Sequence, residues 1–207
     1  MNLSKYNNDG WGISTSGFEK MLEILKSTDF KKFERYNILE FGSGISTEFF
    51  VDYIIENDLK NVFITSFEND SKFMTLARHQ QLDLKLRRLI TCNDVDYNEM
   101  FNKKAFNPYK VSYLINEPET RQRNCFYNIE ENDMPNSIEF VLVDGPSGNG
   151  RNLAFLHMLG KLHKDAIVFI DDYRHYDFLE KFKDLYACEE LFEKTDIYGC
   201  YIILKII

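Results

Sequence analysis

The short apolar segment Tyr36–Phe41 is followed by two glycines that are separated by one residue. Residues Ile38–Thr47 read ILEFGSGIST, which predicts a strand, a glycine turn and a helix that begins near Ser46. Gly42 and Gly44 allow the backbone to turn tightly and to approach a ligand without a Cβ clash. The first N–H groups of the following helix are free to bind polar or anionic atoms. The segment is a candidate ligand-binding loop, and its alternative interpretation is a tight structural turn.

An acidic residue follows the next apolar segment. Residues Asn61–Phe67 predict a second strand, and Glu68 stands at its end, 24 residues after Gly44. A carboxylate at this place can accept hydrogen bonds from both hydroxyls of a ribose. A dinucleotide fold needs a third glycine in the loop, and Thr47 occupies that position. The spacing therefore favours a ribose-containing ligand and counts against an NAD(P)-type dinucleotide.

Three further acidic residues lie where two later strands are predicted to end. Asp144 follows the apolar segment Ile138–Val143, and Asp171 and Asp172 follow Ala166–Ile170. Parallel sheets bind ligands beyond the carboxyl ends of their strands, so we expect these carboxylates at one edge. Oxygen ligands of this kind suit Mg²⁺, Mn²⁺ or Ca²⁺, whereas helix capping or turn formation is the alternative role. The three acids are candidate catalytic groups and candidate metal ligands.

The segments around these residues alternate between strand and helix patterns. Helices are predicted after the capping-box sequence Ser16–Glu19, after the glycine loop, and over Ser71–Gln81, Leu153–Leu162 and Tyr176–Leu185. Leu86–Cys92 predicts a third strand, and Glu190–Ile207 predicts two strands with a turn at Tyr198-Gly199. Continuous apolar strands between helices indicate an α/β protein with a parallel sheet covered on both faces. The final hairpin adds an antiparallel strand.

The stretch 97–136 interrupts this alternation between the third and fourth strands. It has mixed charge and is rich in aromatic residues, which argues against plain disorder. A long insertion in a compact α/β domain is typically a lid or a substrate loop. We therefore expect one domain, 1–207, with a lid or substrate insertion at about 97–136.

The pattern Glu-x-Gly-x-Gly, formed by Glu40, Gly42 and Gly44, resembles motif I of the class I S-adenosylmethionine-dependent methyltransferases. The resemblance implies a Rossmann-like fold with a seven-strand, mostly parallel sheet and S-adenosyl-L-methionine as the cofactor. In that family the acid at the Glu40 position lies near the amino-acid end of the cofactor, and the acid at Glu68 binds the ribose. The cofactor-binding residues implied in this way are Glu40, Gly42, Ser43, Gly44, Ser46, Thr47, Glu68, Asn69, Asp94 and Asp144.

Within this set, Asp94 follows the predicted third strand, where the family often contacts adenine. Asp96 is the alternative contact. Either assignment depends on Leu86–Cys92 being the third strand of the sheet.

A narrower resemblance covers about residues 130–180. The segments Asn132–Pro135, Val143–Arg151 and Phe169–Arg174 are similar, in this order, to those of the glucuronoxylan 4-O-methyltransferase family and its bacterial relatives. This implies a sugar hydroxyl as the methyl acceptor, in a surface polysaccharide or a glycan precursor. The loop Gly145–Arg151 is shorter than in those enzymes. Catechol O-methyltransferases place metal-binding acids at similar positions, but they carry a base lysine where this chain has Ser147.

The resemblances imply direct methyl transfer from a sulfonium to an oxygen, with a protein group that takes the hydroxyl proton. Asp144 is the leading candidate for the base or for a metal ligand. Asp171 and Asp172 are candidates for contacts with a divalent cation, Mg²⁺ or Mn²⁺, or with a substrate hydroxyl. His175 is the second candidate base because imidazole titrates near neutral pH, and exposure in a loop is its alternative.

Two arginines accompany these acids in the sequence. Arg151 and Arg174 can bind the carboxylate of an acidic sugar through bidentate hydrogen bonds. Their alternative role is a structural salt bridge to Asp144, Asp171 or Asp172. Both are candidate substrate-binding residues.

Composition restricts the remaining classes of function. The chain has 207 residues and a net charge of −8, which counts against nucleic-acid binding by phosphate neutralisation. Its longest apolar runs are far shorter than the roughly 20 residues that span a bilayer, and Met1–Gly10 lacks the apolar core of a signal peptide. The four cysteines have no Cys-x-x-Cys spacing, as expected for reduced thiols in the cytoplasm.

These observations predict a cytoplasmic, S-adenosylmethionine-dependent O-methyltransferase that acts on a sugar or another small hydroxyl compound. One alternative is an NAD(P)-linked oxidoreductase. Another is a non-catalytic methyltransferase-like protein that binds the cofactor or a partner. The presence together of Glu40, Gly42, Gly44 and Glu68 counts against a decayed cofactor site.

Overall fold

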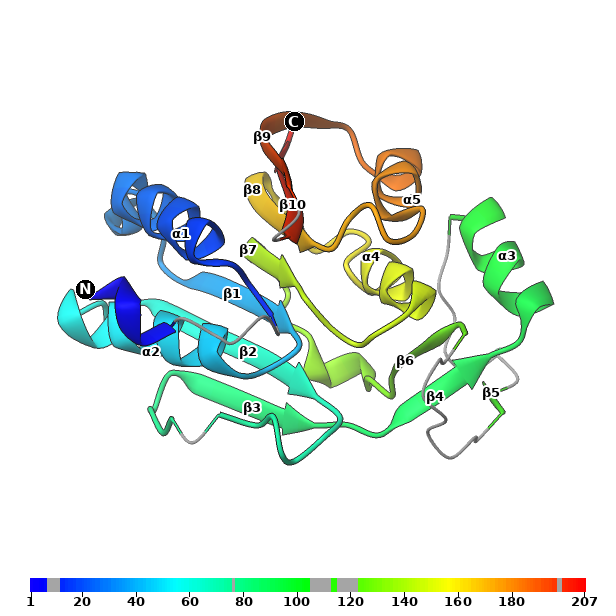
Figure 1. Ribbon diagram of the computed structural model, residues 1–207, viewed down its shortest axis with the longest axis horizontal. Coiled ribbons are helices and arrows are strands. Elements are labelled where there is room, and N and C mark those ends of the chain that lie inside the picture. The colour runs from blue at the N-terminus through cyan, green and yellow to red at the C-terminus, as the bar shows by residue number, and fades with distance from the viewer. Residues whose placement is uncertain (7–11, 76, 105–112, 115–122, 197–198) are drawn as a thin grey trace.

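A computed structural model describes residues 1–6, 12–75, 77–104, 113–114, 123–196 and 199–207 (Figure 1). Its principal sheet has seven strands in the order β3-β2-β1-β7-β8-β10-β9. The strands are β1 (Tyr36–Phe41), β2 (Val62–Glu68), β3 (Leu82–Leu86), β7 (Ile138–Val143), β8 (Leu162–Asp171), β9 (Cys188–Asp196) and β10 (Gly199–Ile206). All neighbouring pairs are parallel except those that β10 forms with β8 and β9. The predicted Rossmann-like class I fold with its C-terminal hairpin strand is confirmed.

Strands β1 and β7 form the centre of this sheet, and every residue of both is buried. Such unbroken burial is expected for parallel strands that are covered on both faces. The register pairs Phe41 with Phe67 on one side and with Val143 on the other. The three strands β2, β1 and β7 therefore end at the same level. Glu68, the last residue of β2, lies at the same edge of the sheet as the segments that follow β1 and β7.

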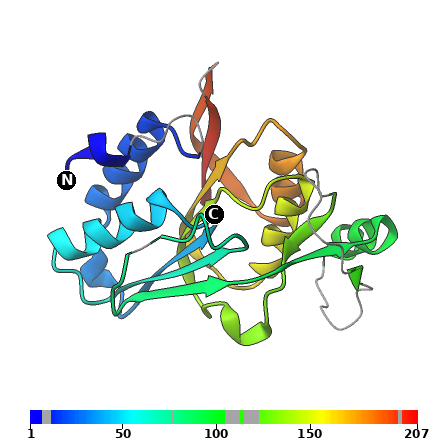
Figure 2. The ribbon, with the colours of Figure 1, turned by 60° about the horizontal axis from the view of Figure 1, so that its bottom comes forward.

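Helices cover the two faces of the sheet. Helices α1 (Thr15–Ser27) and α2 (Ile45–Glu56) lie on one face, and α4 (Leu153–His157) and α5 (Phe178–Leu185) lie on the other (Figures 1 and 2). The first face has a core that includes Phe18 and Phe49, and the second has one that includes Phe155 and Phe182. Short 3₁₀ helices complete the chain at Leu3–Tyr6, Phe30–Lys32, Glu131–Asp133 and Asn149–Asn152. Within the described part of the chain, none of the helices has the length and apolarity that crossing a bilayer requires.

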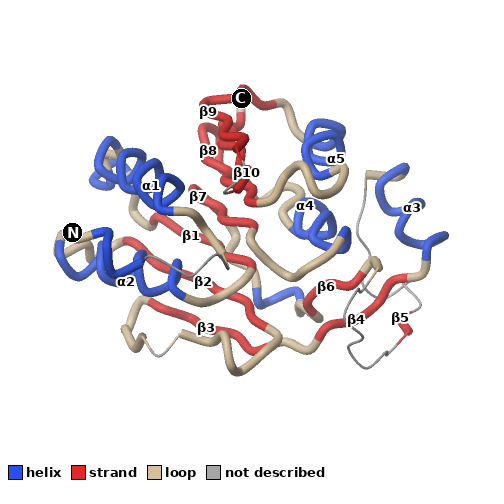
Figure 3. The backbone as a smooth tube through the Cα atoms, in the orientation of Figure 1, coloured by secondary structure: helices blue, strands red, loops and turns tan. Residues whose placement is uncertain are grey.

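A second, three-stranded antiparallel sheet lies beside the first, in the order β5-β4-β6. Its strands are β4 (Leu89–Cys92), β5 (Tyr113–Leu114) and β6 (Cys125–Tyr127), and α3 (Asp94–Asn102) follows β4 (Figure 3). The expected insertion at about 97–136 overlaps these elements in part, and its residues 105–112 and 115–122 lie outside the described residues. The predicted third strand was placed too late, because the third strand of the principal sheet is β3 and Leu89–Cys92 belongs to the smaller sheet.

Other predicted boundaries also differ from the structure. The helix predicted over Ser71–Gln81 is wrong for the described residues, which form turns and irregular backbone. Helix α1 begins earlier than the capping-box sequence indicates, because Ser14 is the N-cap and its side chain accepts a bond from the Gly17 N–H. Helix α4 ends at His157, earlier than predicted, and β8 already begins at Leu162. Helix α5 begins at Phe178, two residues later than predicted. The predicted C-terminal strand pair is confirmed, and Tyr198 of its turn lies outside the described residues.

A bidentate ion pair joins the residue after β3 to the segment that leads into β7. Arg87 follows β3 directly, and its Nε and Nη2 lie 2.8 Å and 2.6 Å from the two carboxylate oxygens of Asp133. Lys85 Nζ lies 3.3 Å from the same carboxylate. Burial raises the pKa of Asp133, but the bonds from Arg87 outweigh it, so that the net shift is downward. The chain thus leaves the principal sheet and returns to it at one fixed point.

Candidate functional site

The glycine loop after β1 packs directly against the loop after β7. The N–H groups of Asp144 and Gly145 donate to the carbonyl of Phe41 at 2.9 Å and 2.6 Å. Gly42 has a φ of 99°, and a Cβ at this position would lie 2.9 Å from the nitrogen of Gly145. Backbone therefore touches backbone, and a side chain cannot be accommodated at Gly42. A Cβ at Gly44 would meet only the Phe73 carbonyl, at 3.6 Å, so protein packing does not require this second glycine.

Glu40 fixes the start of α2. Its buried carboxylate accepts hydrogen bonds from the hydroxyls of Ser46 at 2.5 Å, Thr47 at 2.6 Å and Ser66 at 2.6 Å. Burial raises the pKa of Glu40 to about 7, while the three hydroxyl bonds act in the opposite direction. Two of the predicted cofactor-binding side chains, Ser46 and Thr47, are therefore engaged with Glu40. Their backbone N–H groups lie in the first turn of α2, where N–H groups lack partners within the helix.

Glu68 reaches from the end of β2 to the glycine loop. Its Oε1 accepts hydrogen bonds from the N–H groups of Asn69 at 2.7 Å and Asp70 at 2.8 Å. Burial raises the pKa of Glu68, and backbone hydrogen bonds, one of them from Ser43, lower it. The carboxylate thus lies between β2 and the loop, at the place where the sequence analysis expects a ribose. Asn69 is exposed beside it.

The segment after Glu68 borders the glycine loop, a feature that the sequence analysis missed. The Thr75 N–H lies 3.4 Å from Ser43 Oγ, and the Thr75 hydroxyl lies 3.1 Å from Glu48 Oε1. The side chain of Phe73 in the same segment is 62% exposed. No sequence signal marked these residues, because they fell inside a stretch predicted as helix.

The structure brings Asp144 and Asp171 together at the ends of β7 and β8. Their carboxyl groups are hydrogen-bonded to each other. Burial, followed by the negative charge of Asp144, raises the pKa of Asp171 well above its usual range. Burial also raises the pKa of Asp144 to about 7, although the positive charge of Arg151 lowers it. Two carboxyls in contact disfavour double ionisation, so one of them keeps its proton at a pH at which an isolated carboxyl loses it.

Arg151 is part of the framework of this pair. It is only 5% exposed, its Nε donates to the Pro146 carbonyl at 3.0 Å, and its Nη1 donates to the Asp171 carbonyl at 3.1 Å. Its guanidinium carbon also lies 5.5 Å from the centre of the Phe178 ring. These contacts favour the structural alternative over the predicted binding of a substrate carboxylate, with backbone carbonyls as the partners.

Arg174 is likewise engaged with its own protein. Its Nη2 lies 2.9 Å from Glu193 Oε1 and its Nε lies 2.7 Å from the Tyr173 hydroxyl. Tyr173 also donates a short hydrogen bond to Glu193. Arg174 therefore closes a surface network between the turn after β8 and β9, and its partner is Glu193 in place of the three predicted acids.

Asp172 and His175 lie in the turn after β8, and Asp172 has a left-handed φ of 53°. His175 Nδ1 lies 3.5 Å from Asp172 Oδ1, and the His175 side chain is 61% exposed. Asp171, the last residue of β8, contacts Asp144, whereas the carboxylate of Asp172 lies beside His175 and Cys200. The predicted metal set of Asp144, Asp171 and Asp172 is therefore not brought together as three ligands. In the described ranges, the group with ligand atoms within 4.8 Å of one another is Asp172, His175 and Cys200.

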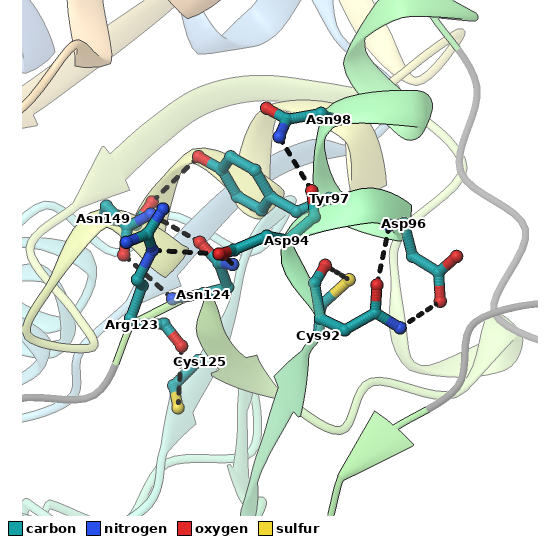
Figure 4. A network of polar contacts seen from close by, with 10 residues as sticks. Cys92, Asp94, Asp96, Tyr97, Asn98, Arg123, Asn124, Cys125 and Asn149 are labelled. Atoms are coloured by element: carbon teal, nitrogen blue, oxygen red, sulfur yellow. Dashed lines mark hydrogen bonds and ion pairs between the residues drawn. The ribbon is translucent and has the colours of Figure 1, made fainter.

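Asp94 does not follow the third strand of the principal sheet, so the premise of its predicted adenine contact is wrong. It begins α3 beyond the smaller sheet, where its Oδ1 lies 3.0 Å from Arg123 Nε and accepts from Asn124 Nδ2 at 2.7 Å (Figure 4). The alternative, Asp96, accepts a bond from the Asn93 side chain at 2.7 Å. Both acids thus serve the start of α3.

Asn124 and Asn149 connect the insertion to the loop after β7. The N–H of Asn124 donates to Asn149 Oδ1 at 2.8 Å, and Asn149 Nδ2 donates to Asn124 Oδ1 at 2.6 Å (Figure 4). The Tyr97 hydroxyl donates to the Asn149 carbonyl at 3.3 Å. The insertion is therefore docked on the loop that holds Gly145 and Arg151. Asparagine pairs separated by this distance in sequence carry no recognisable signal.

Tyr127 of β6 is a second contribution of the insertion that the sequence analysis missed. It is 1% exposed and stacks on Phe41, the last residue of β1, and on Phe67, the residue before the end of β2. A Cβ at Gly145 would approach the Tyr127 hydroxyl to 2.5 Å. The aromatic content of the insertion was the only available sign that it packs against the principal sheet.

Comparisons with known proteins give fold neighbours only. No family model matches the chain, and no curated protein matches it. A solved structure described as a SAM-dependent methyltransferase from Aquifex aeolicus matches with a TM-score of 0.44 and 11% identity over 100% of both chains. Another, from Streptococcus mutans, matches with a TM-score of 0.40 and 7% identity over 82% of this chain and 44% of that one. These values are low, so the function is argued from the site itself.

Proposed function

We propose that this protein is an S-adenosylmethionine-dependent O-methyltransferase that acts on a sugar or another small hydroxyl compound. One observation carries the proposal. The glycine loop, with an acid placed to bind a ribose, is in direct backbone contact with the loop that holds one of two adjacent carboxyl groups. Glu68 and the glycine loop form one half, and Asp144 and Asp171 form the other. The contact between Gly42 and Gly145 joins the two halves at the carboxyl edge of the sheet.

The residues of the first half fit the cofactor. Gly42 is explained by its contact with Gly145, but Gly44 has only an ordinary contact at 3.6 Å, which suits a ligand that passes close to the backbone. Glu68 would accept hydrogen bonds from the ribose hydroxyls, and the N–H groups at the start of α2 would bind the polar amino-acid end. When bound, the cofactor supplies a methyl group on a sulfonium.

The second half fits a hydroxyl acceptor. A hydroxyl group must lose its proton as its oxygen is methylated, and a base with a pKa near the working pH does this best. Asp144, with its pKa raised by burial to about 7, has that property. Asp171 and Arg151 would hold it in position. His175, the second candidate base, is exposed and farther along the turn.

The predicted Mg²⁺ or Mn²⁺ does not fit the three acids. Asp144 and Asp171 are hydrogen-bonded to each other, and the carboxylate of Asp172 lies with His175 and Cys200. The charge of Arg151 already compensates the pair. The proposed methyl transfer therefore uses no cation at these carboxylates, and the base acts directly on the hydroxyl.

The alternatives differ in what they bind. For an NAD(P)-linked oxidoreductase, the position of the third glycine is filled by Thr47, whose hydroxyl is bonded to Glu40. A non-catalytic binding protein would retain the first half without needing the second.

The insertion, docked on the loop after β7, would form the wall of the acceptor site and set its preference for glycans or other hydroxyl compounds.

Calorimetric titration with S-adenosylhomocysteine tests the proposal. We expect micromolar binding that is lost in Glu68→Gln and kept in Glu34→Gln, a matched change at an exposed glutamate. Transfer of labelled methyl groups to a panel of sugars then tests the acceptor class. Binding of NADH with no binding of S-adenosylhomocysteine would refute the proposal, and cofactor binding without any methyl transfer would favour the non-catalytic alternative.

A further inference from the structure

A second cluster of chemically reactive side chains lies one residue beyond the acid pair. It joins Asp172 and His175 of the turn after β8 to Cys200 at the start of β10. The carboxylate oxygen, the imidazole nitrogen and the thiol sulfur lie within 4.8 Å of one another. This cluster takes no part in the proposed methyl transfer.

The backbone holds the three residues together. The Asp172 N–H donates to the Cys200 carbonyl at 2.8 Å, which continues the pairing of β8 with β10. The His175 N–H donates to the Asp172 carbonyl at 2.9 Å, which closes the turn. The left-handed φ of Asp172 is a conformation that Asp tolerates better than most residues. The spacing of the three side chains is therefore set by regular hydrogen bonds.

The distances suit ligands of one ion better than a hydrogen bond. His175 Nδ1 and Asp172 Oδ1 are 3.5 Å apart, which is longer than a good hydrogen bond of about 2.7–3.2 Å. In tetrahedral zinc sites, ligand distances of about 2.0–2.3 Å place neighbouring ligand atoms about 3.3–3.6 Å apart. The observed separation matches such an edge. Since His175 is exposed, its side chain can move the remaining distance toward the thiol.

We propose that Asp172, His175 and Cys200 form a binding site for a zinc-type divalent cation. One oxygen, one nitrogen and one sulfur ligand are the set that zinc accepts, whereas Mg²⁺ and Ca²⁺ require oxygen. Three protein ligands leave a fourth position open, and the exposed side of His175 gives it access to solvent. The inference does not rest on the proposed methyl transfer.

Titration of the chelator-treated protein with Co²⁺ tests this site, because a thiolate ligand gives cobalt a charge-transfer band in the near ultraviolet. We expect one Co²⁺ per chain, a thiolate band, and displacement by Zn²⁺. Cys200→Ser should remove the band. His175→Ala, a change at an exposed residue, should weaken binding at least tenfold without altering the melting temperature.

Two matched variants serve as controls. Cys188→Ser and His163→Ala change a partly buried cysteine and an exposed histidine outside the cluster, and both should bind like the parent protein. The absence of a thiolate band, or a band lost in Cys188→Ser and kept in Cys200→Ser, would overturn the proposal. Binding that survives His175→Ala unchanged would do the same, whether or not Cys200→Ser folds. The titration with S-adenosylhomocysteine, run on the same samples, tests the proposed function separately.

Discussion

Alanine substitution at the two glycines of the loop after β1 separates packing from ligand binding. At Gly42, a Cβ would lie 2.9 Å from the nitrogen of Gly145, and φ is 99°. The left-handed backbone costs about 1–2 kcal/mol for a residue with a side chain, and overpacking costs about 1–3 kcal/mol. Gly42→Ala should therefore lose about 2–5 kcal/mol of unfolding free energy. At Gly44, a Cβ would meet one carbonyl at 3.6 Å, so Gly44→Ala should stay within about 0.5 kcal/mol of the parent.

The parent protein and Gly44→Ala should be equally stable but should differ in their affinity for the cofactor. Gly44→Ala places a methyl group where the cofactor is proposed to pass, so its affinity for S-adenosylhomocysteine should fall at least tenfold while its urea midpoint is unchanged. Urea denaturation and calorimetry on the same preparations measure both quantities. If Gly44→Ala binds as tightly as the parent, the loop is a structural turn and the cofactor reasoning fails. If Gly42→Ala is as stable as the parent, the close approach of the two loops is refuted.

Three further predictions address the acids. Asp144→Asn should abolish methyl transfer but leave S-adenosylhomocysteine binding intact, with Asp184→Asn as a neutral control. The kcat of the parent should decrease below about pH 7, because the pair then takes up a second proton, and a flat pH profile would exclude Asp144 as the base. Glu40 binds its proton more tightly in the folded state, with a pKa raised to about 7, so unfolding free energy should fall by about 3 kcal/mol between about pH 4.5 and pH 7. Glu40→Gln should flatten that decline in urea titrations at several pH values, and an unchanged slope would assign it to other groups. Asp133→Ala should cost about 1.5–3 kcal/mol, because it leaves Arg87 without its bidentate partner, and a melting temperature equal to that of the parent would contradict this.

The central strands were predictable because each is a short, mostly apolar segment that is bounded by turn-forming residues. Residues Tyr36–Phe41 and Ile138–Val143 are apolar or tolerate burial throughout, and both boundaries agree with the structure. Strand β3 was missed because it is an edge strand in which Asp83 and Lys85 alternate with leucines, so its apolar run is weak. The continuous run Leu89–Cys92 looked like a better third strand, yet it pairs only within the smaller sheet.

The error at β3 also removes the premise of the adenine contact that was predicted for Asp94. The predicted adenine contact came from counting strands, and an incorrect third strand moved it onto the insertion. Asp94, Asn124 and Asn149 form a network that depends on two segments folding back on each other, about which neither local propensity nor periodicity gives information. Residues that are placed by the regular sheet were therefore predictable, and residues that are placed by the insertion were not.

The acids at the end of β8 show the limit of the strand-end rule itself. The rule assigns Asp144, Asp171 and Asp172 to one edge, and all three lie there. It treats consecutive residues as equivalent, although β8 ends at Asp171 and Asp172 already belongs to the turn, with a left-handed φ of 53°. Asp171 consequently pairs with Asp144, while Asp172 faces the neighbouring antiparallel strand and meets Cys200. The change from strand to turn thus separates the predicted metal ligands into a pair of contacting carboxyls and a mixed-ligand cluster, two groups that call for different chemistry.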